Sequence, residues 1–175
     1  MLHRLRSYIR QHHVAFLALF AALGGGGAYA ASLGGGTVRG FNQTVTKTQA
    51  TDSGTLAKLG GLALKFRSKS LEDLRTCTLS AKASDAGQLS GFSAEKILSG
   101  GSGKSFDVRS RSLKAGGTAV VGATHADAGA PDVSRTLEGH LTWHNDKTGQ
   151  VVTSVFHVSA ETPRCRFQGT LTGAG

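Results

Sequence analysis

The stretch RTLEGHLTWHNDKTGQVVTSVFHVSA, residues 135–160, decides the fold of this 175-residue chain. Apolar and polar residues alternate on both sides of the turn-forming letters HNDKTG, which is typical of two antiparallel strands joined as a hairpin. The simplest pairing sets His144 opposite Gly149. Leu141 then lies opposite Val152, and slipping the pairing by two residues leaves every side chain on the same face. The predicted core side of the hairpin consists of Leu137, Leu141, Trp143, Val152, Phe156 and Val158.

The same alternation recurs in short segments along the rest of the chain, and turn-forming Gly, Asn, Asp or Pro residues separate these segments. This pattern predicts an all-β domain, a β-sandwich of about seven antiparallel strands. The strands are expected at residues 62–70, 74–82, 105–113, 117–125, 135–145, 149–160 and 164–173. One helical turn or two is expected in SAEKILSGG, residues 93–101, capped by Ser93 and ended by Gly100.

The first thirty residues have the composition of an export leader. Three arginines in the first ten residues precede the apolar run VAFLALFAALGGGGAYA, and the run ends in the small residues of a cleavage site. We therefore expect residues 1–30 to be a signal peptide cleaved after Ala30, or an uncleaved membrane anchor helix. In both cases the arginines hold the N-terminus inside, so that the rest of the chain lies outside the cytoplasm.

A change in composition divides the rest of the chain at about residue 61. Residues 31–61 are rich in Gly, Thr, Ser and Ala and poor in large apolar groups. Such a composition predicts a flexible tether, with one strand near residues 44–48. Residues 62–175 are expected to form the β-sandwich domain.

Charge and cysteine content indicate the surroundings of the exported part. Seventeen of the twenty basic residues and all eleven acidic residues follow residue 30, which gives a net charge of about +6. A basic exported protein is attracted to anionic envelope polymers, lipid headgroups or nucleic acid. Cys77 and Cys165 most simply form one disulfide in an oxidising compartment, and two separate buried thiols are the alternative.

Basic residues at strand spacing are the candidate anion-binding residues. Because each group occupies alternate positions, each projects from one face of its strand. The alternative is that these cations serve solubility and protect sheet edges from pairing with other strands. Aromatic residues are scarce, so no platform for stacking sugars or bases is expected. The three groups are Lys65, Arg67 and Lys69; Arg109 and Arg111; and Arg164 and Arg166.

Histidines on the outer face of the 135–160 hairpin suggest a weak metal site. On a strand His140 and His144 lie about 13 Å apart, which is too far for one ion. His140 and His157 approach each other diagonally across the hairpin, with Glu138 as a third ligand. The alternative is that these imidazoles face solvent or pack against their neighbours.

Two motifs resemble catalytic or nucleotide-binding signatures and fail on inspection. LSGGSGKS at residues 98–105 has Leu98 where a phosphate-binding loop needs glycine, and a strand-like segment follows it in place of a helix. The S-x-x-K and K-T-G triplets at residues 93–96 and 147–149 lack the third element of penicillin-binding enzymes. We therefore assign no catalytic residue, no cofactor and no nucleotide.

The leader ALFAALGGGGAYAA and the stretches LAKLGGLALKF, LTWHNDKTGQVVTSVFHVSA and RCRFQGTLTG resemble small exported β-rich proteins of high-GC actinobacteria. The likeness covers much of the chain, but its motifs are low in complexity. It implies export and a β-fold, and it assigns no activity and no site residues.

Together these features predict an exported or cell-envelope-associated, non-enzymatic β-domain. Its expected partner is an anionic cell-wall polymer or membrane surface, and nucleic acid is not expected. The alternative is an exported hydrolase or metal-binding protein that uses the outer face of the 135–160 hairpin.

Overall fold

The computed structural model describes residues 31–33, 36–46, 51–71, 74–97, 105–127, 135–161 and 163–174. The secondary structure of these residues consists of eleven strands and no helix. None of the described segments is a helix that could cross a membrane. The predicted leader, residues 1–30, lies outside the described residues.

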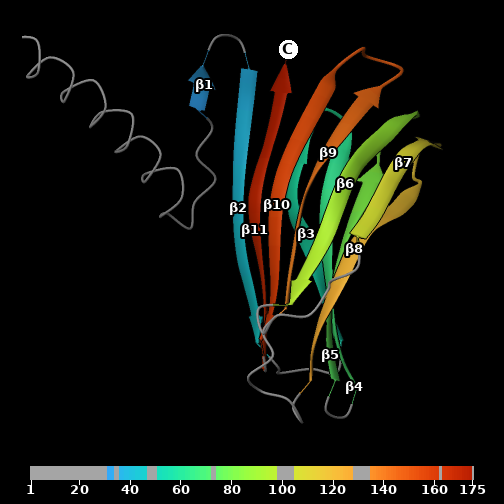
Figure 1. The fold of residues 1–175 in the computed structure, drawn as a ribbon. Coiled ribbons are helices and arrows are strands. Elements are labelled where there is room, and N and C mark those ends of the chain that lie inside the picture. The colour runs from blue at the N-terminus through green and yellow to red at the C-terminus, as the bar shows by residue number, and fades with distance from the viewer. Residues whose placement is uncertain are drawn as a thin grey trace, which may run out of the picture.

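All strand pairs are antiparallel, and the strands form two sheets that pack as a sandwich (Figure 1). The larger sheet has seven strands in the order β1-β2-β11-β10-β9-β6-β7, and the smaller has four in the order β3-β4-β5-β8. The strands are β1 (Ala31–Leu33), β2 (Gly36–Thr46), β3 (Thr51–Leu59), β4 (Leu62–Leu71), β5 (Leu74–Ala83), β6 (Gly87–Ile97), β7 (Ser105–Leu113), β8 (Thr118–Asp127), β9 (Arg135–Asn145), β10 (Val151–Glu161) and β11 (Arg164–Ala174).

The predicted all-β sandwich is confirmed, and each of the seven expected strands is present. Alternate residues of the strands point between the sheets, which buries their apolar side chains away from water. Trp143 is the largest of them, and its indole Nε1 donates a hydrogen bond to the backbone oxygen of Gly60 at 3.1 Å. Other fully buried side chains are Phe167, Leu62, Leu64, Leu79, Leu89, Leu137, Leu141, Leu171, Val121, Val152 and Val158.

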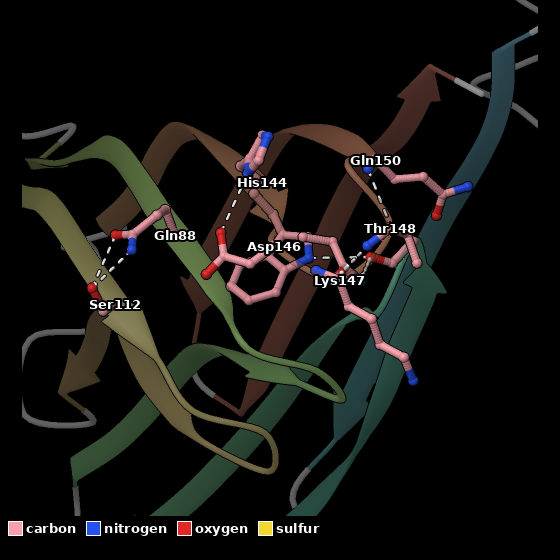
Figure 2. A network of polar contacts seen from close by, with 10 residues as sticks. Gln88, Ser112, His144, Asp146, Lys147, Thr148 and Gln150 are labelled. Carbon is pink, nitrogen blue, oxygen red and sulfur yellow. Dashed lines mark hydrogen bonds and ion pairs between the residues drawn. The ribbon is translucent and has the colours of Figure 1, made fainter.

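The β9–β10 hairpin has the predicted faces in a register slipped by two residues. His144 lies opposite Val151, not opposite Gly149, and all six predicted core residues are buried. The slip arises because Asn145 organises a wider turn. Its backbone oxygen accepts a hydrogen bond from the Gly149 N–H at 2.8 Å, and its Oδ1 accepts one from the Lys147 N–H at 3.0 Å. Figure 2 shows this turn, in which Lys147 and Thr148 carry labels.

The disulfide between Cys77 and Cys165 joins the two sheets. Cys77 lies on β5 of the four-stranded sheet, Cys165 lies on β11 of the seven-stranded sheet, and both are fully buried. The Ser68 hydroxyl lies 3.3 Å from the Cys165 sulfur. The even cysteine count therefore predicts this pair, and the two-thiol alternative does not hold.

Residues 31–61 differ from the expected tether. Of these, residues 36–46 form β2, which pairs along its length with β11, and residues 51–59 form β3 of the other sheet. Only Phe41, Val45 and Ala57 are buried in these two strands, because one face of each is exposed near the edge of the sandwich. Their strand structure depends on backbone pairing, of β2 with the distant β11 and of β3 with the adjacent β4, which composition does not reveal.

The helical turn expected from Ser93 is also corrected, because residues 87–97 form strand β6. The Ser93 hydroxyl donates to the backbone oxygen of Val121 at 2.9 Å and caps no helix. The Glu95 carboxylate is buried and accepts a hydrogen bond from the Thr124 hydroxyl at 2.9 Å. Ser93, which suggested a helix start, and Glu95 therefore point between the two sheets.

Candidate anion-binding surface

The register of the four-stranded sheet gathers basic side chains on its outer face. Leu62, Leu64 and Phe66 of β4 are buried, so the intervening positions point outward. Among them, Ala63 lies between Lys58 of β3 and Lys82 of β5. We call the five outward-pointing basic residues the cationic face; they are Lys58, Lys65, Arg67, Lys69 and Lys82.

A hollow lies at one end of the cationic face, and its volume is about 570 Å³. Its basic lining residues are Lys58, Lys65 and Lys82, together with Arg39 from β2 of the seven-stranded sheet. None of the described residues that line it is acidic. The other lining residues are Thr55, Leu59, Gly60, Gly61, Leu62, Ala63, Ala83, Ser84 and Gly116.

Small side chains make room for the hollow. Ala63 is only 7% exposed although it points outward, which indicates that neighbouring side chains cover it. Lysine stems commonly lie over apolar surface while their ammonium groups stay in water. Lys58 and Lys82 flank Ala63 from the two neighbouring strands, about 10 Å apart at the backbone. Both ammonium groups can therefore reach one anion above Ala63.

The rim of the hollow is held by hydrogen bonds between turns. The Gly60 oxygen, in the β3–β4 turn, accepts hydrogen bonds from Trp143 Nε1 at 3.1 Å and from Asn145 Nδ2 at 3.2 Å. The Gly61 oxygen accepts one from the Ser84 N–H at 2.7 Å. These bonds connect the rim to both sheets, so the hollow exists before any ligand arrives.

The remaining predicted basic residues lie elsewhere. Arg164 and Arg166 alternate with the buried Cys165 and Phe167, so they point outward from the opposite face of the sandwich. Arg111 is exposed on β7, the edge strand of the seven-stranded sheet. Arg109 is on the same strand, and its side chain is not among those that the structure describes. The three predicted groups thus do not form one surface.

Two of the three predicted metal ligands, Glu138 and His157, contact each other, and Glu138 also binds Lys96. Glu138 Oε2 accepts a hydrogen bond from Lys96 Nζ at 2.7 Å, and Glu138 Oε1 lies 3.2 Å from His157 Nδ1. The hydrogen bond from Lys96 is the main cause that lowers the pKa of Glu138, and burial acts against it. His140 lies opposite Val155 in the register. In the described part of the chain, no three His, Cys, Asp or Glu residues come together as a metal site.

The other histidine of this hairpin, His144, is close to the turn. Its Nδ1 lies 3.5 Å from Asp146 Oδ1, and Gln88 and Ser112 form a separate hydrogen-bonded pair nearby (Figure 2). Both pairs are solvent-exposed and local to the strand ends. The first pair lies at the β9–β10 turn and the second joins β6 to β7, and neither includes His140 or His157.

Sequence reasoning found three of the five residues of the cationic face. Lys58 was missed because it lies in the expected tether, and so was Arg39 of the hollow. Lys82 was available from the alternation of LRTCTLSAK, which places it on the face of Thr76, Thr78 and Ser80. What the sequence could not show is that β3 and β5 flank β4 on both sides.

The chain matches no protein-family model, and comparisons with curated proteins and with solved structures give no match either.

Proposed function

We propose that this chain is an exported or cell-envelope-associated, non-enzymatic β-sandwich that binds an anionic partner through the cationic face. The observation that carries the proposal is the hollow, whose described lining includes four basic residues and no acidic residue. Charges that serve only solubility are normally mixed in sign. A concave site of one sign concentrates the electric field and attracts ions of the opposite sign.

The arrangement favours binding over catalysis. Hydroxyl, glycine and aliphatic residues surround Lys58, Lys65 and Lys82, and the described lining of the hollow includes no carboxylate or imidazole that could transfer protons. The nearby cations repel one another, and a bound anion relieves that repulsion. The site therefore gains free energy by holding an anion without changing it.

Two features support export. The first thirty residues have the order of an export leader, and the disulfide is of the kind that persists in oxidising compartments. Anionic polymers and lipid headgroups are the partners that an exported basic domain meets at the cell surface. Export and anion binding are thus consistent with each other.

A pair of charge-reversal variants of the full chain tests the proposal. Lys58→Glu/Lys82→Glu changes the cationic face, and Arg164→Glu/Arg166→Glu makes the same change in net charge on the opposite face. We expect the first variant to bind dextran sulfate about tenfold or more weakly, since two charge-assisted contacts are lost. The second should stay within about threefold of the parent protein.

The measurement is the dissociation constant at several salt concentrations, with circular dichroism to check the fold. Equal losses in the two variants would show that net charge alone attracts the polymer, and the proposal would be wrong. It would also be wrong if the parent protein did not bind dextran sulfate at low salt.

A further inference from the structure

The cationic face continues beyond the hollow as a line of charge with a regular border. Along β4, outward-pointing Lys65, Arg67 and Lys69 follow one another at intervals of about 7 Å. Each lies between two hydroxyl residues in the register. The flanking pairs are Thr55 and Ser80 beside Lys65, Ser53 and Thr78 beside Arg67, and Thr51 and Thr76 beside Lys69.

We propose that the ligand of the cationic face is a linear phosphodiester polymer of small polyol units, which lies along β4 from the hollow to Lys69. This inference rests on the proposed function and names its ligand. From the row of Ala63 to that of Lys69 the site is about 20 Å long. It therefore spans several charged repeats of a chain and is far longer than one phosphate group.

The chemistry of the side chains favours phosphate over sugar rings. Apart from Ala63 and Leu74, the described outward positions of β3, β4 and β5 carry ammonium, guanidinium and hydroxyl groups, with no amide, carboxylate or aromatic side chain among them. Proteins recognise pyranose rings and bases through aromatic stacking and amide or carboxylate hydrogen bonds, which this face does not offer. Hydroxyl and ammonium donors suit the oxygens of a phosphodiester.

The ends of the site are defined by changes in residue type. At one end the β3–β4 turn closes the hollow at Gly60 and Gly61. At the other end, the row of Lys69 and Thr76 continues to His125 on β8, whose Nδ1 lies 3.8 Å from the buried Glu95 carboxylate. Asp127, the one acidic residue at a described outward position of this sheet, comes two residues later. The cationic stretch is thus bounded, as a binding site for a segment of chain would be.

The shape of the site favours a single chain over a bilayer. The charges form one line along β4 with a hollow at its end, whereas a bilayer presents headgroups over a broad plane. The most exposed apolar residue of this sheet, Val120, lies on edge strand β8 beside Ser80, not on the line of charge. A chain can enter the hollow and contact Arg39, Lys58, Lys65 and Lys82 together, which a flat surface cannot do.

The test titrates the full chain with 1,3-linked poly(glycerol phosphate) of defined lengths. The comparison ligands are glycerol phosphate, polygalacturonate of matched length and phosphatidylglycerol vesicles. We expect affinity for poly(glycerol phosphate) to rise with length up to about 20 Å and then to level off. It should exceed the affinity for polygalacturonate by about tenfold, and glycerol phosphate should bind at least about a hundredfold more weakly.

A matched pair of neutral variants locates the ligand. Arg67→Gln/Lys69→Gln should reduce the slope of log K against log salt by about 1.4, if each contact contributes as it does with single-stranded polyanions. It should leave binding of the shortest chains unchanged, because these fill only the hollow. Arg164→Gln/Arg166→Gln, on the opposite face, should change neither quantity.

The outcomes separate this inference from the function on which it rests. Equal affinity for polygalacturonate, affinity that does not depend on length, or stronger binding to the vesicles would overturn the inference. The proposed function would still stand if Lys58→Glu/Lys82→Glu alone weakened binding of dextran sulfate. If that variant and its opposite-face control behaved alike, the proposed function itself would fail.

Discussion

The two outer faces of the sandwich differ in how their charges are arranged. The described outward positions of the four-stranded sheet carry five basic residues and one acidic residue. The described outward positions of β2, β6, β9, β10 and β11 carry three basic residues, Lys96, Arg164 and Arg166, and two acidic residues, Glu138 and Glu161. Lys96 binds Glu138 at 2.7 Å, and Arg164 lies opposite Glu161. The comparison teaches that a modest net charge can conceal one face that is almost entirely cationic and another on which the two signs nearly balance.

The largest effect we expect concerns the disulfide that holds the two faces in place. Replacing both Cys77 and Cys165 with alanine should lower the free energy of unfolding by about 4–5 kcal/mol, because a link between positions 88 residues apart restricts the unfolded chain. Urea denaturation measures the loss. Polyanion affinity of the protein that stays folded should be unchanged, since Lys58, Lys65 and Lys82 belong to one sheet. A parallel fall in affinity would show that the cationic face depends on the opposite sheet.

The second effect compares two glycines at the rim of the hollow. Gly61 and Gly116 have φ values of 80° and 78°, which side chains rarely adopt. A Cβ at Gly61 would lie 2.5 Å from Asn145 Nδ2, whereas nothing lies within 4 Å of one at Gly116. Gly116→Ala should cost about 1 kcal/mol for the backbone alone, and Gly61→Ala about 3 kcal/mol, because it also displaces Asn145 from its hydrogen bonds. Equal losses of unfolding free energy in the two variants would show that the hydrogen bonds of Asn145 do not hold the rim.

The third effect concerns a cation on the inner side of the four-stranded sheet. Arg75 is 4% exposed, its Nη2 donates to the Val45 oxygen at 3.3 Å, and its Nε and Nη1 have no hydrogen-bond partner among the residues that the structure describes. Burial lowers its pKa, and Asp52 acts in the opposite direction. Arg75→Met should raise the free energy of unfolding by up to about 1 kcal/mol, because it removes a buried charge with unmet hydrogen bonds.

Anion binding should not change in the Arg75→Met variant, since this guanidinium points away from the cationic face. Thermal denaturation and the polyanion titration measure the two quantities. Destabilisation of more than about 2 kcal/mol would contradict this prediction and show that the Arg75 guanidinium makes more hydrogen bonds than the one to Val45.

The smallest effect concerns the balanced face. Because the pKa of Glu138 is lowered in the folded protein, its carboxylate stabilises the fold above the unfolded-state pKa near 4.5. This contribution is lost as the pH falls through the lower folded-state pKa. It should stay below about 1 kcal/mol, since Lys96 and Glu138 are both exposed. The free energies of unfolding of the parent and of Glu138→Gln, measured as a function of pH, should differ near neutral pH and converge in acid. A difference that does not change with pH would contradict this prediction.

Strong alternation was enough to predict the interior of the fold. In the hairpin at residues 135–160, Leu137, Leu141 and Trp143 fix which face is buried whatever the exact register. The register itself depended on Asn145, whose side chain and backbone hydrogen bonds widen the turn. A two-residue slip preserves the faces, so hydrophobic periodicity alone could not detect it.

Weakly apolar strands were not predictable in the same way. β2 and β3 bury only Phe41, Val45 and Ala57, and their pairing partners lie far away in the sequence or across a turn of two glycines. The hollow needs Arg39 and Lys58 from these strands. The basic residues that the sequence did show, Lys65, Arg67 and Lys69, therefore indicated the line of charge without its concave end.

The position of β11 has a consequence for the order in which the fold can be completed. β11 lies between β2 and β10 and carries Cys165 (Figure 1). The ribosome releases residues 36–46 long before residues 164–174, so β2 must wait for the strand with which it pairs along its whole length. Closure of the sandwich is thus coupled to the synthesis of the last strand.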